Sequence, residues 1–162
     1  MRANTLVKSS KQDTCMTLNI IKLCVGADSV EDLATWQAGR LRTMKAAGEK
    51  QPRLYHTTFQ SPKRRDEVLD GGSLYWVIKG VIQVRQPIIG FGEGTKDNGS
   101  PCCLIYLANE LIQVRPTPRR PFQGWRYLDG ADAPPDLKGG KANQIAEMPA
   151  ALRRELANLG LL

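Results

Sequence analysis

The sequence has few of the side chains on which familiar enzyme chemistry depends. Only one of its 162 residues, His56, is a histidine, so a single unperturbed side chain titrates near neutral pH. No G-x-S-x-G segment marks the nucleophile of a common lipase or esterase. Gly90, Gly92 and Gly94 are not followed by GK[ST] or by a predicted helix, as a phosphate-binding loop requires. We therefore expect no catalytic residue, and an enzyme is the less favoured class.

Cysteines are few, and their spacing fits neither redox nor zinc motifs. The four cysteines form no C-x-x-C, and an adjacent pair such as Cys102 and Cys103 rarely closes a disulfide without strain. Joining Cys24 and His56 to that pair in a zinc site would require neighbouring strands, and the spacing matches no known zinc pattern. We expect reduced thiols, no metal and no cofactor.

Long apolar runs and an acidic surplus are also missing. No window approaches the roughly 20 apolar residues of a membrane-spanning helix, and the N-terminal segment lacks the apolar stretch of a secretory signal. The expected location is cytoplasmic, without a membrane partner. Lys and Arg number 23 against 16 Asp and Glu, a net charge of +7 that attracts polyanions. RNA is the expected partner ahead of DNA, and the oligomeric state is left open.

Composition divides the chain into three parts. Residues 1–15 are polar and aperiodic, and apolar side chains become dense from Met16 onward. This predicts a disordered N-terminal arm over residues 1–15, or translation starting at Met16 instead of Met1. A single α+β domain is expected over residues 16–141, followed by a C-terminal helical segment over residues 142–162.

Capping residues and periodicity predict the elements. Ser29 and Asp32 form a capping box for a helix that ends at Gly48. A short helix begins at Ser61 and Pro62 and ends before the glycines at 71 and 72, and a third starts at residue 149 with an apolar stripe of Leu152, Leu156 and Leu159. Residues 90–100 are predicted to form a flexible loop. Strands are expected over residues 17–25, 53–59, 73–78, 81–89, 102–107, 111–115 and about 125–127.

Lys79 and Gly80 form the tightest turn available between two of these strands, and they predict a β-hairpin. A single strand bent at Gly80 is the alternative. In the hairpin register Val77 faces Ile82 and Tyr75 faces Val84, which leaves a mixed opposite face. That face comprises Trp76, Gln83 and Arg85.

Many short strands with two early helices and one C-terminal helix predict an α+β fold. Its sheet is expected to be mainly antiparallel and strongly curled, or closed into a small pseudo-barrel. Function must then come from sites on this fold.

Basic and aromatic side chains gather in two segments, SPKRRDE and PRRPFQGWRY. Arginine binds phosphate bidentately and flat rings stack on unpaired bases, so this combination suits single-stranded nucleic acid. The competing interpretation is that Trp125 and Phe122 are core anchors. The predicted nucleic-acid contacts are Lys63, Arg64, Arg65, Trp76, Arg85, Arg119, Arg120, Gln123, Trp125 and Arg126.

Two other functions stay open at this point. The first is a small-molecule enzyme with a pocket lined by His56, Tyr75, Trp76 and Lys79. The second is a protein-interaction module that presents the proline-rich RRPF segment to a partner.

Three segments of the chain carry a resemblance: "IIKLCVGADSVEDLATWQ", "PKRRDEVLDGGSLYWVIKG" and "RRPFQGWRYLDGADAPPDL". They resemble an uncharacterised family of alphaproteobacterial proteins, a domain of unknown function of about 150 residues. This resemblance implies no established catalytic residues. More loosely, "DEVLDGGSLYWVIKG" is similar to PUA-like and ASCH-type pseudo-barrels, although the G-x-K-x-x-E-x-R pattern of ASCH domains is absent. That similarity implies binding of RNA or modified bases.

Overall fold

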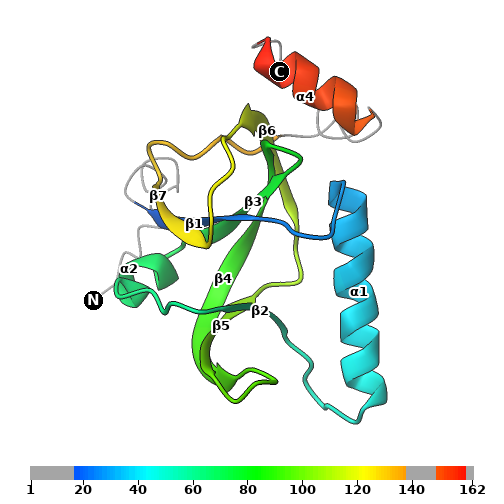
Figure 1. The fold of residues 1–162 in the computed structure, drawn as a ribbon, viewed down its shortest axis with the longest axis vertical. Coiled ribbons are helices and arrows are strands. Elements are labelled where there is room, and N and C mark those ends of the chain that lie inside the picture. The colour runs from blue at the N-terminus through cyan, green and yellow to red at the C-terminus, as the bar shows by residue number, and fades with distance from the viewer. Residues whose placement is uncertain (1–16, 138–148, 160–162) are drawn as a thin grey trace, which may run out of the picture.

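The computed structural model describes residues 17–137 and 149–159, and over these ranges one mixed sheet of seven strands is accompanied by three helices (Figure 1). The predicted arm over residues 1–15 lies outside the described residues, as does part of the C-terminal segment. The helices are α1 (Val30–Ala46), α2 (Arg65–Leu69) and α4 (Ala150–Asn158). The strands are β1 (Leu18–Leu23), β2 (Leu54–Thr58), β3 (Ser73–Ile78), β4 (Val81–Thr95), β5 (Pro101–Leu107), β6 (Ile112–Pro118) and β7 (Trp125–Asp129).

The sheet is open, with strand order β2-β5-β4-β3-β1-β7 and with β6 paired to β4 beside this path. Only the β1–β3 pair is parallel among these strands. The prediction of a strongly curled sheet or pseudo-barrel was therefore wrong. The predicted arrangement of two early helices and one C-terminal helix was also wrong, because α2 lies within the strand sequence, between β2 and β3.

The long strand β4 joins the two halves of the sheet. Its first half pairs with β3 and β6, and its second half pairs with β5, to which β2 adds the outer strand. The segment α1-β2-α2 is a crossover that returns the chain beside β1, while β2 itself is carried to the far edge (Figure 1). Because β2 and β7 occupy opposite edges, the sheet does not close.

The starts of two helices show which of the predicted helix boundaries are correct. The predicted cap of α1 is confirmed: the Ser29 hydroxyl accepts a hydrogen bond from the backbone N–H of Asp32 at 3.1 Å. The second helix begins at Arg65 instead of at Ser61 and Pro62. None of the helices in the described ranges has the length and apolar character needed to cross a membrane.

The hairpin between β3 and β4 is confirmed, but its register differs from the prediction. Lys79 and Gly80 have φ of 52° and 76°, as a two-residue type I′ turn requires. Val77 faces Ile82 as predicted, and a bulge then follows. Its extra residue is Gln83, whose amide donates to the Ile78 carbonyl at 3.0 Å.

The bulge reverses the faces of the residues beyond it. Trp76 pairs with Val84 and Tyr75 with Arg85, so the predicted Tyr75–Val84 pair was wrong. Paired side chains lie on the same face of a sheet. Trp76 and Arg85 therefore lie on opposite faces and form no mixed surface.

Residues 90–95 extend β4, so the predicted loop over residues 90–100 was wrong for its first half. Gly90 pairs with Tyr106 and Gly92 pairs with Leu104 on β5, and the Tyr106 ring lies over both glycines. A Cβ on Gly92 would meet this ring at 2.9 Å, and one on Gly94 would meet Leu104 at 3.2 Å. The alternating glycines provide room for neighbouring side chains, and they do not make the segment a loop.

The C-terminal helix α4 packs with a different face from the predicted one. Arg153 and Ala157 are buried, whereas Leu152 and Leu159 are exposed. The Arg153 guanidinium lies 3.9 Å from the Glu31 carboxylate at the start of α1. Leu156, the third residue of the predicted stripe, is half-buried, and the sequence had left open what this helix packs against.

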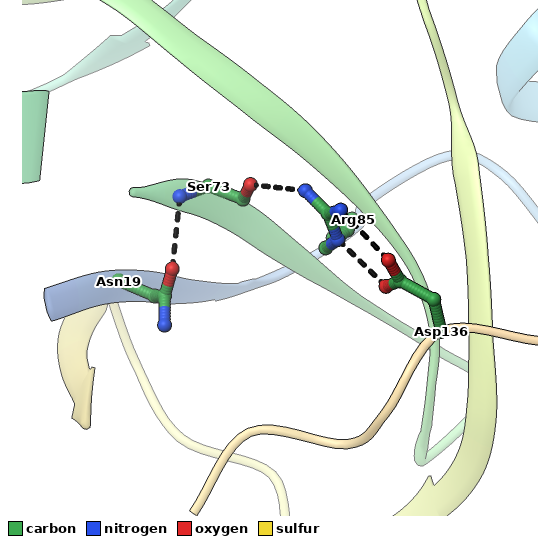
Figure 2. A network of polar contacts seen from close by, with 4 residues as sticks. All are labelled: Asn19, Ser73, Arg85 and Asp136. Atoms are coloured by element: carbon green, nitrogen blue, oxygen red, sulfur yellow. Dashed lines mark hydrogen bonds and ion pairs between the residues drawn. The ribbon is translucent and has the colours of Figure 1, made fainter. Parts of the chain in front are cut away.

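Polar side chains join four segments on the Arg85 face of the sheet (Figure 2). Asn19 on β1 accepts from the backbone N–H of Ser73 on β3 at 2.9 Å. The Arg85 guanidinium donates to the Ser73 hydroxyl at 2.9 Å and to both Asp136 carboxylate oxygens at 2.7 and 2.8 Å. Arg85 is thus held by a bidentate ion pair, and it fixes the segment after β7 to the sheet.

The Gly72→Ala substitution should strongly destabilise the fold. A Cβ at Gly72 would lie 2.3 Å from the Val68 carbonyl oxygen and 2.4 Å from that of Leu18, and neither backbone can move without breaking α2 or β1. We expect a loss of about 3 kcal/mol or more in the free energy of unfolding, measured by urea denaturation.

Gly39→Ala is the matched control, because its Cβ would meet only the Arg42 side chain at 3.7 Å on α1. It should raise the free energy of unfolding by about 0.5–1 kcal/mol. Equal unfolding midpoints for the two variants would contradict the packing described for Gly72.

Candidate functional site

The structure disperses the basic and aromatic residues that the sequence proposed as one surface. Trp76 is only 4% exposed and lies in the core. Arg85, on the other face, is neutralised by Asp136. Arg85 is therefore not available to bind phosphate, and Trp76 presents no exposed ring on the surface that the sequence predicted.

The first basic segment lies beside β7. Arg64 pairs with Glu67 at 2.5 Å and lies 5.4 Å from the centre of the Tyr127 ring. Arg65 contacts Ser61 and lies 5.8 Å from the centre of the Phe91 ring. Lys63 is exposed. These contacts hold α2 against the sheet. They also engage the Arg64 and Arg65 guanidinium groups, which the prediction had assigned to phosphate binding.

The second segment divides between the two faces of the sheet. Trp125 packs against the core cluster that contains Trp76, and its indole donates to the Gln60 carbonyl at 2.9 Å. Arg126 is the next residue along β7 and lies over Phe122, which packs against the opposite cluster. Trp125 is thus fixed by packing, as the alternative interpretation expected. The remaining members, which are exposed, are Arg119, Arg120 and Gln123.

A cavity of about 370 Å³ lies instead between the end of β1, the start of α1, β2 and β3. Its side chains are mainly apolar and aromatic, and no Asp or Glu is among them. It is lined by Lys22, Leu23, Cys24, Val25, Gly26, Ala27, Leu33, Trp36, His56, Thr57 and Trp76. We call it the aromatic pocket.

Strand and helix periodicity place these side chains. Lys22 on β1 pairs with Trp76 on β3 and with Trp125 on β7, so the three side chains share one face. Leu33 and Trp36 are three residues apart on α1 and thus neighbours on the helix surface. Leu33 is buried and Trp36 remains 57% exposed, at the rim of the aromatic pocket.

A buried amide network fixes the indole of Trp76. Its Nε1–H donates to Gln86 Oε1 at 3.2 Å. Gln86 and Gln37 exchange two amide hydrogen bonds of 2.9 and 3.0 Å, and Gln86 also donates to the Ala108 carbonyl at 2.7 Å. The wall of the aromatic pocket is therefore preformed, and α1 is attached to the sheet beside it.

Two polar groups of the aromatic pocket have no partner in the described part of the chain. No hydrogen bond or ion pair joins the Lys22 amine to another described residue, and burial together with the nearby Lys96 lowers its pKa. The Nε2 atom of His56 is buried without a hydrogen-bond partner, and its ring meets that of Trp76 edge-on at 5.2 Å. Burying unpaired polar groups is costly unless a ligand or water satisfies them.

The charge state of His56 follows from its surroundings. Burial, with Lys22 and then Arg40 nearby, lowers the pKa of His56 to about 4, so the imidazole is neutral at physiological pH. Burial also raises the pKa of the Cys24 thiol to about 11, which keeps it protonated and a poor nucleophile. Neither side chain is activated for catalysis in this state. The chemistry that the pocket supports is binding.

The alternative small-molecule pocket predicted from sequence is brought together only in part. His56 and Trp76 both line the aromatic pocket. Tyr75 belongs to the core cluster on the opposite face of the sheet, and Lys79 pairs with Asp28 at 2.9 Å in the turn region. Within the described residues no three His, Cys, Asp or Glu side chains lie close enough to hold a metal ion.

Sequence reasoning missed Lys22 and Trp36, although both carried a signal. Lys22 is the one charged residue in the mainly apolar strand LNIIKL, where a charge requires an explanation. Trp36 lies three residues after the buried Leu33 on α1 but is itself exposed. A large exposed aromatic at the edge of an amphipathic face is a common sign of a binding site.

The low pKa of His56 predicts a specific pH dependence of stability. Above pH 6.5 the imidazole is neutral in both folded and unfolded chains, and its contribution is fully present. Between pH 6.5 and about 4 the unfolded chain binds a proton that the folded chain does not. The free energy of unfolding therefore decreases as the pH is lowered through this range. By pH 4 the loss should reach about 3 kcal/mol.

Urea denaturation across this range would measure the effect, with His56→Phe as the comparison because it keeps the ring and removes the titration. The variant should lose correspondingly less stability than the unmodified protein. Parallel pH profiles for the two proteins would contradict a neutral, buried His56.

Comparison with known proteins identifies a family. No curated protein and no solved structure gives a significant match. A family model described as "Protein of unknown function (DUF1489)" matches residues 20–162, most of the chain, and confirms the expected membership of an uncharacterised family. The protein therefore belongs to the DUF1489 family of proteins of unknown function.

Proposed function

We propose that this protein binds single-stranded RNA by taking one base into the aromatic pocket. The observation that carries the proposal is a cavity of about 370 Å³ with indole and apolar walls. Among the described residues that line it, Lys22 is the one Lys, Arg, Asp or Glu, and its amine has no described partner. An unpaired base combines a flat apolar surface with polar edges, and it matches both properties of this cavity.

The exposed apolar groups on this side of the molecule support an extended ligand. Trp36 and Val25 line the aromatic pocket and are 57% and 92% exposed. An exposed indole beside a cavity offers a stacking platform for the neighbouring base. A strand could thus insert one base and stack the next, whereas a free small molecule would leave Trp36 in water.

The charge pattern supports an anionic ligand. Lys22 has no carboxylate partner among the described residues, and the whole chain carries a net charge of +7. Bringing a negative charge near Lys22 would replace the hydration that the amine loses on burial. These charges support binding at the aromatic pocket in preference to the Arg119–Arg120 segment predicted from sequence.

Removing the stacking surface or the lysine should weaken RNA binding. Trp36→Ala should lower the affinity for a short fluorescein-labelled single-stranded RNA of mixed sequence by about ten-fold, since stacking of a base is worth about 1–3 kcal/mol. Lys22→Met should have an effect of about the same size, because hydrogen bonds to charged groups contribute about 1.5–3 kcal/mol. Fluorescence anisotropy titration measures both effects.

Lys45→Met is the matched control, because it removes the same charge from an exposed part of α1 that does not line the pocket. Its affinity should stay within about two-fold of the unmodified protein. Weakening in the Arg119→Ala/Arg120→Ala double variant alone would favour the sequence-predicted surface and contradict the pocket. Equal binding of the corresponding single-stranded DNA would contradict the choice of RNA.

A further inference from the structure

A second cavity adjoins the aromatic pocket through a shared residue. It measures about 680 Å³ and meets the aromatic pocket at Thr57 on β2. Its walls come from α1, β2, the end of β4, the turn that follows it and β5, and its character is polar. It is lined by Arg40, Tyr55, Thr57, Gly94, Thr95, Lys96, Asp97, Asn98, Cys102 and Leu104.

Arg40 is held in place on one side of this second cavity. Its guanidinium donates to the Tyr55 carbonyl at 3.2 Å and lies 4.2 Å from the centre of the Tyr55 ring and 5.2 Å from that of Trp36. These contacts use aromatic faces and one carbonyl, and no ion pair joins Arg40 to a described carboxylate. The remaining N–H groups are available to an anion.

Lys96 lies on the other side, in a turn with defined geometry. Its backbone N–H donates to the Ser100 carbonyl at 2.8 Å, and the Gly99 N–H donates to the Lys96 carbonyl at 2.9 Å. The amine lies 2.8 Å from the centre of the Phe59 ring. Asp97 also lines the cavity, but no ion pair joins it to Arg40 or Lys96 in the described structure.

The electrostatic influence of these groups extends into the aromatic pocket. Arg40 and Lys22 both act on His56, and Lys96 acts on Lys22. Lys22 lines the aromatic pocket, Arg40 and Lys96 line the second cavity, and the two cavities share Thr57, so cations lie on both sides of the junction. Repulsion among cations without carboxylate partners is relieved when an anion binds between them.

We propose that the second cavity is a phosphate subsite, in which Arg40 and Lys96 hold the phosphate group attached to the nucleotide whose base occupies the aromatic pocket. The inference rests on the proposed function and adds the class of group that this cavity recognises. The guanidinium binds two phosphate oxygens in a fork and the amine binds as a point charge. Thr57 lies at the junction, where a ribose would join the two parts of the ligand.

Comparing the affinities of nucleosides with those of their monophosphates tests the phosphate subsite separately from the aromatic pocket. Adenosine, uridine and their 5′- and 3′-monophosphates would be titrated into the protein, with calorimetry or the fluorescence of Trp36 and Trp76 as the signal. At least one monophosphate should bind about ten-fold more tightly than its nucleoside, since charge-assisted hydrogen bonds to phosphate are made only by the former.

The Arg40→Gln/Lys96→Gln double variant should reduce this ratio of affinities to about one. The control, Arg42→Gln/Lys45→Gln, removes the same charge from exposed positions on α1 outside the cavity and should keep the ratio. Lys96→Gln alone, on a surface turn, should lower the ratio without risk to the helix and serves if the double variant fails to fold.

The outcomes distinguish the two proposals. A nucleoside that binds no less tightly than its monophosphates, or a double variant that keeps the ratio, would overturn the phosphate subsite and leave the base-binding pocket standing. Failure of every nucleoside and monophosphate to bind would overturn the pocket and the subsite together.

Discussion

The arrangement of α1 on the sheet depends on one buried amide, that of Gln86. The residue is fully buried on β4, and its side chain satisfies the indole of Trp76, the amide of Gln37 and the carbonyl of Ala108. Leaving a buried amide without partners would destabilise the fold by more than its hydrogen bonds stabilise it. Loss of any one member of this network is therefore expected to destabilise the others. It fixes how far α1 stands from β3, and that distance sets the width of the aromatic pocket.

The pocket and the polar cavity beside it use α1 in different ways. The buried side of α1 contributes Leu33 to the aromatic wall, and its exposed side contributes Trp36 and Arg40. Apolar burial holds the helix in place, while the cations and the exposed indole face water. The site therefore combines a rigid floor, which needs no rearrangement to accept a flat ring, with charges that are unpaired within the described residues. Preorganisation of this kind lowers the entropic cost of binding.

Local signals in the sequence predicted the elements better than their arrangement. Ser29 and the Lys79–Gly80 turn act through neighbours a few residues away, and both were predicted correctly. The bulge at Gln83 depends on the partner strands, so its reversal of Trp76 and Arg85 could not be seen in the periodicity. The position of β2 at the far edge is equally non-local, and it decided that the sheet stays open. Lys22 was missed because its place in a pocket depends on residues of α1, β2 and β3 that are distant in the sequence.

Parallel pairing of β1 with β3 makes the pocket a late product of folding. The strands β3, β4, β5 and β6 follow one another in the chain and can pair through short connections, whereas Ile20 meets Leu74 only after α1, β2 and α2 have crossed over. The chain between β1 and β3 loses conformational entropy before the pairing of these strands compensates for the loss. Closing such a long loop is therefore expected to delay the contact between β1 and β3. We therefore expect the sheet of β3 to β6 to form first and to be the surface on which β1 and α1 dock, so that the cavity is completed late in folding.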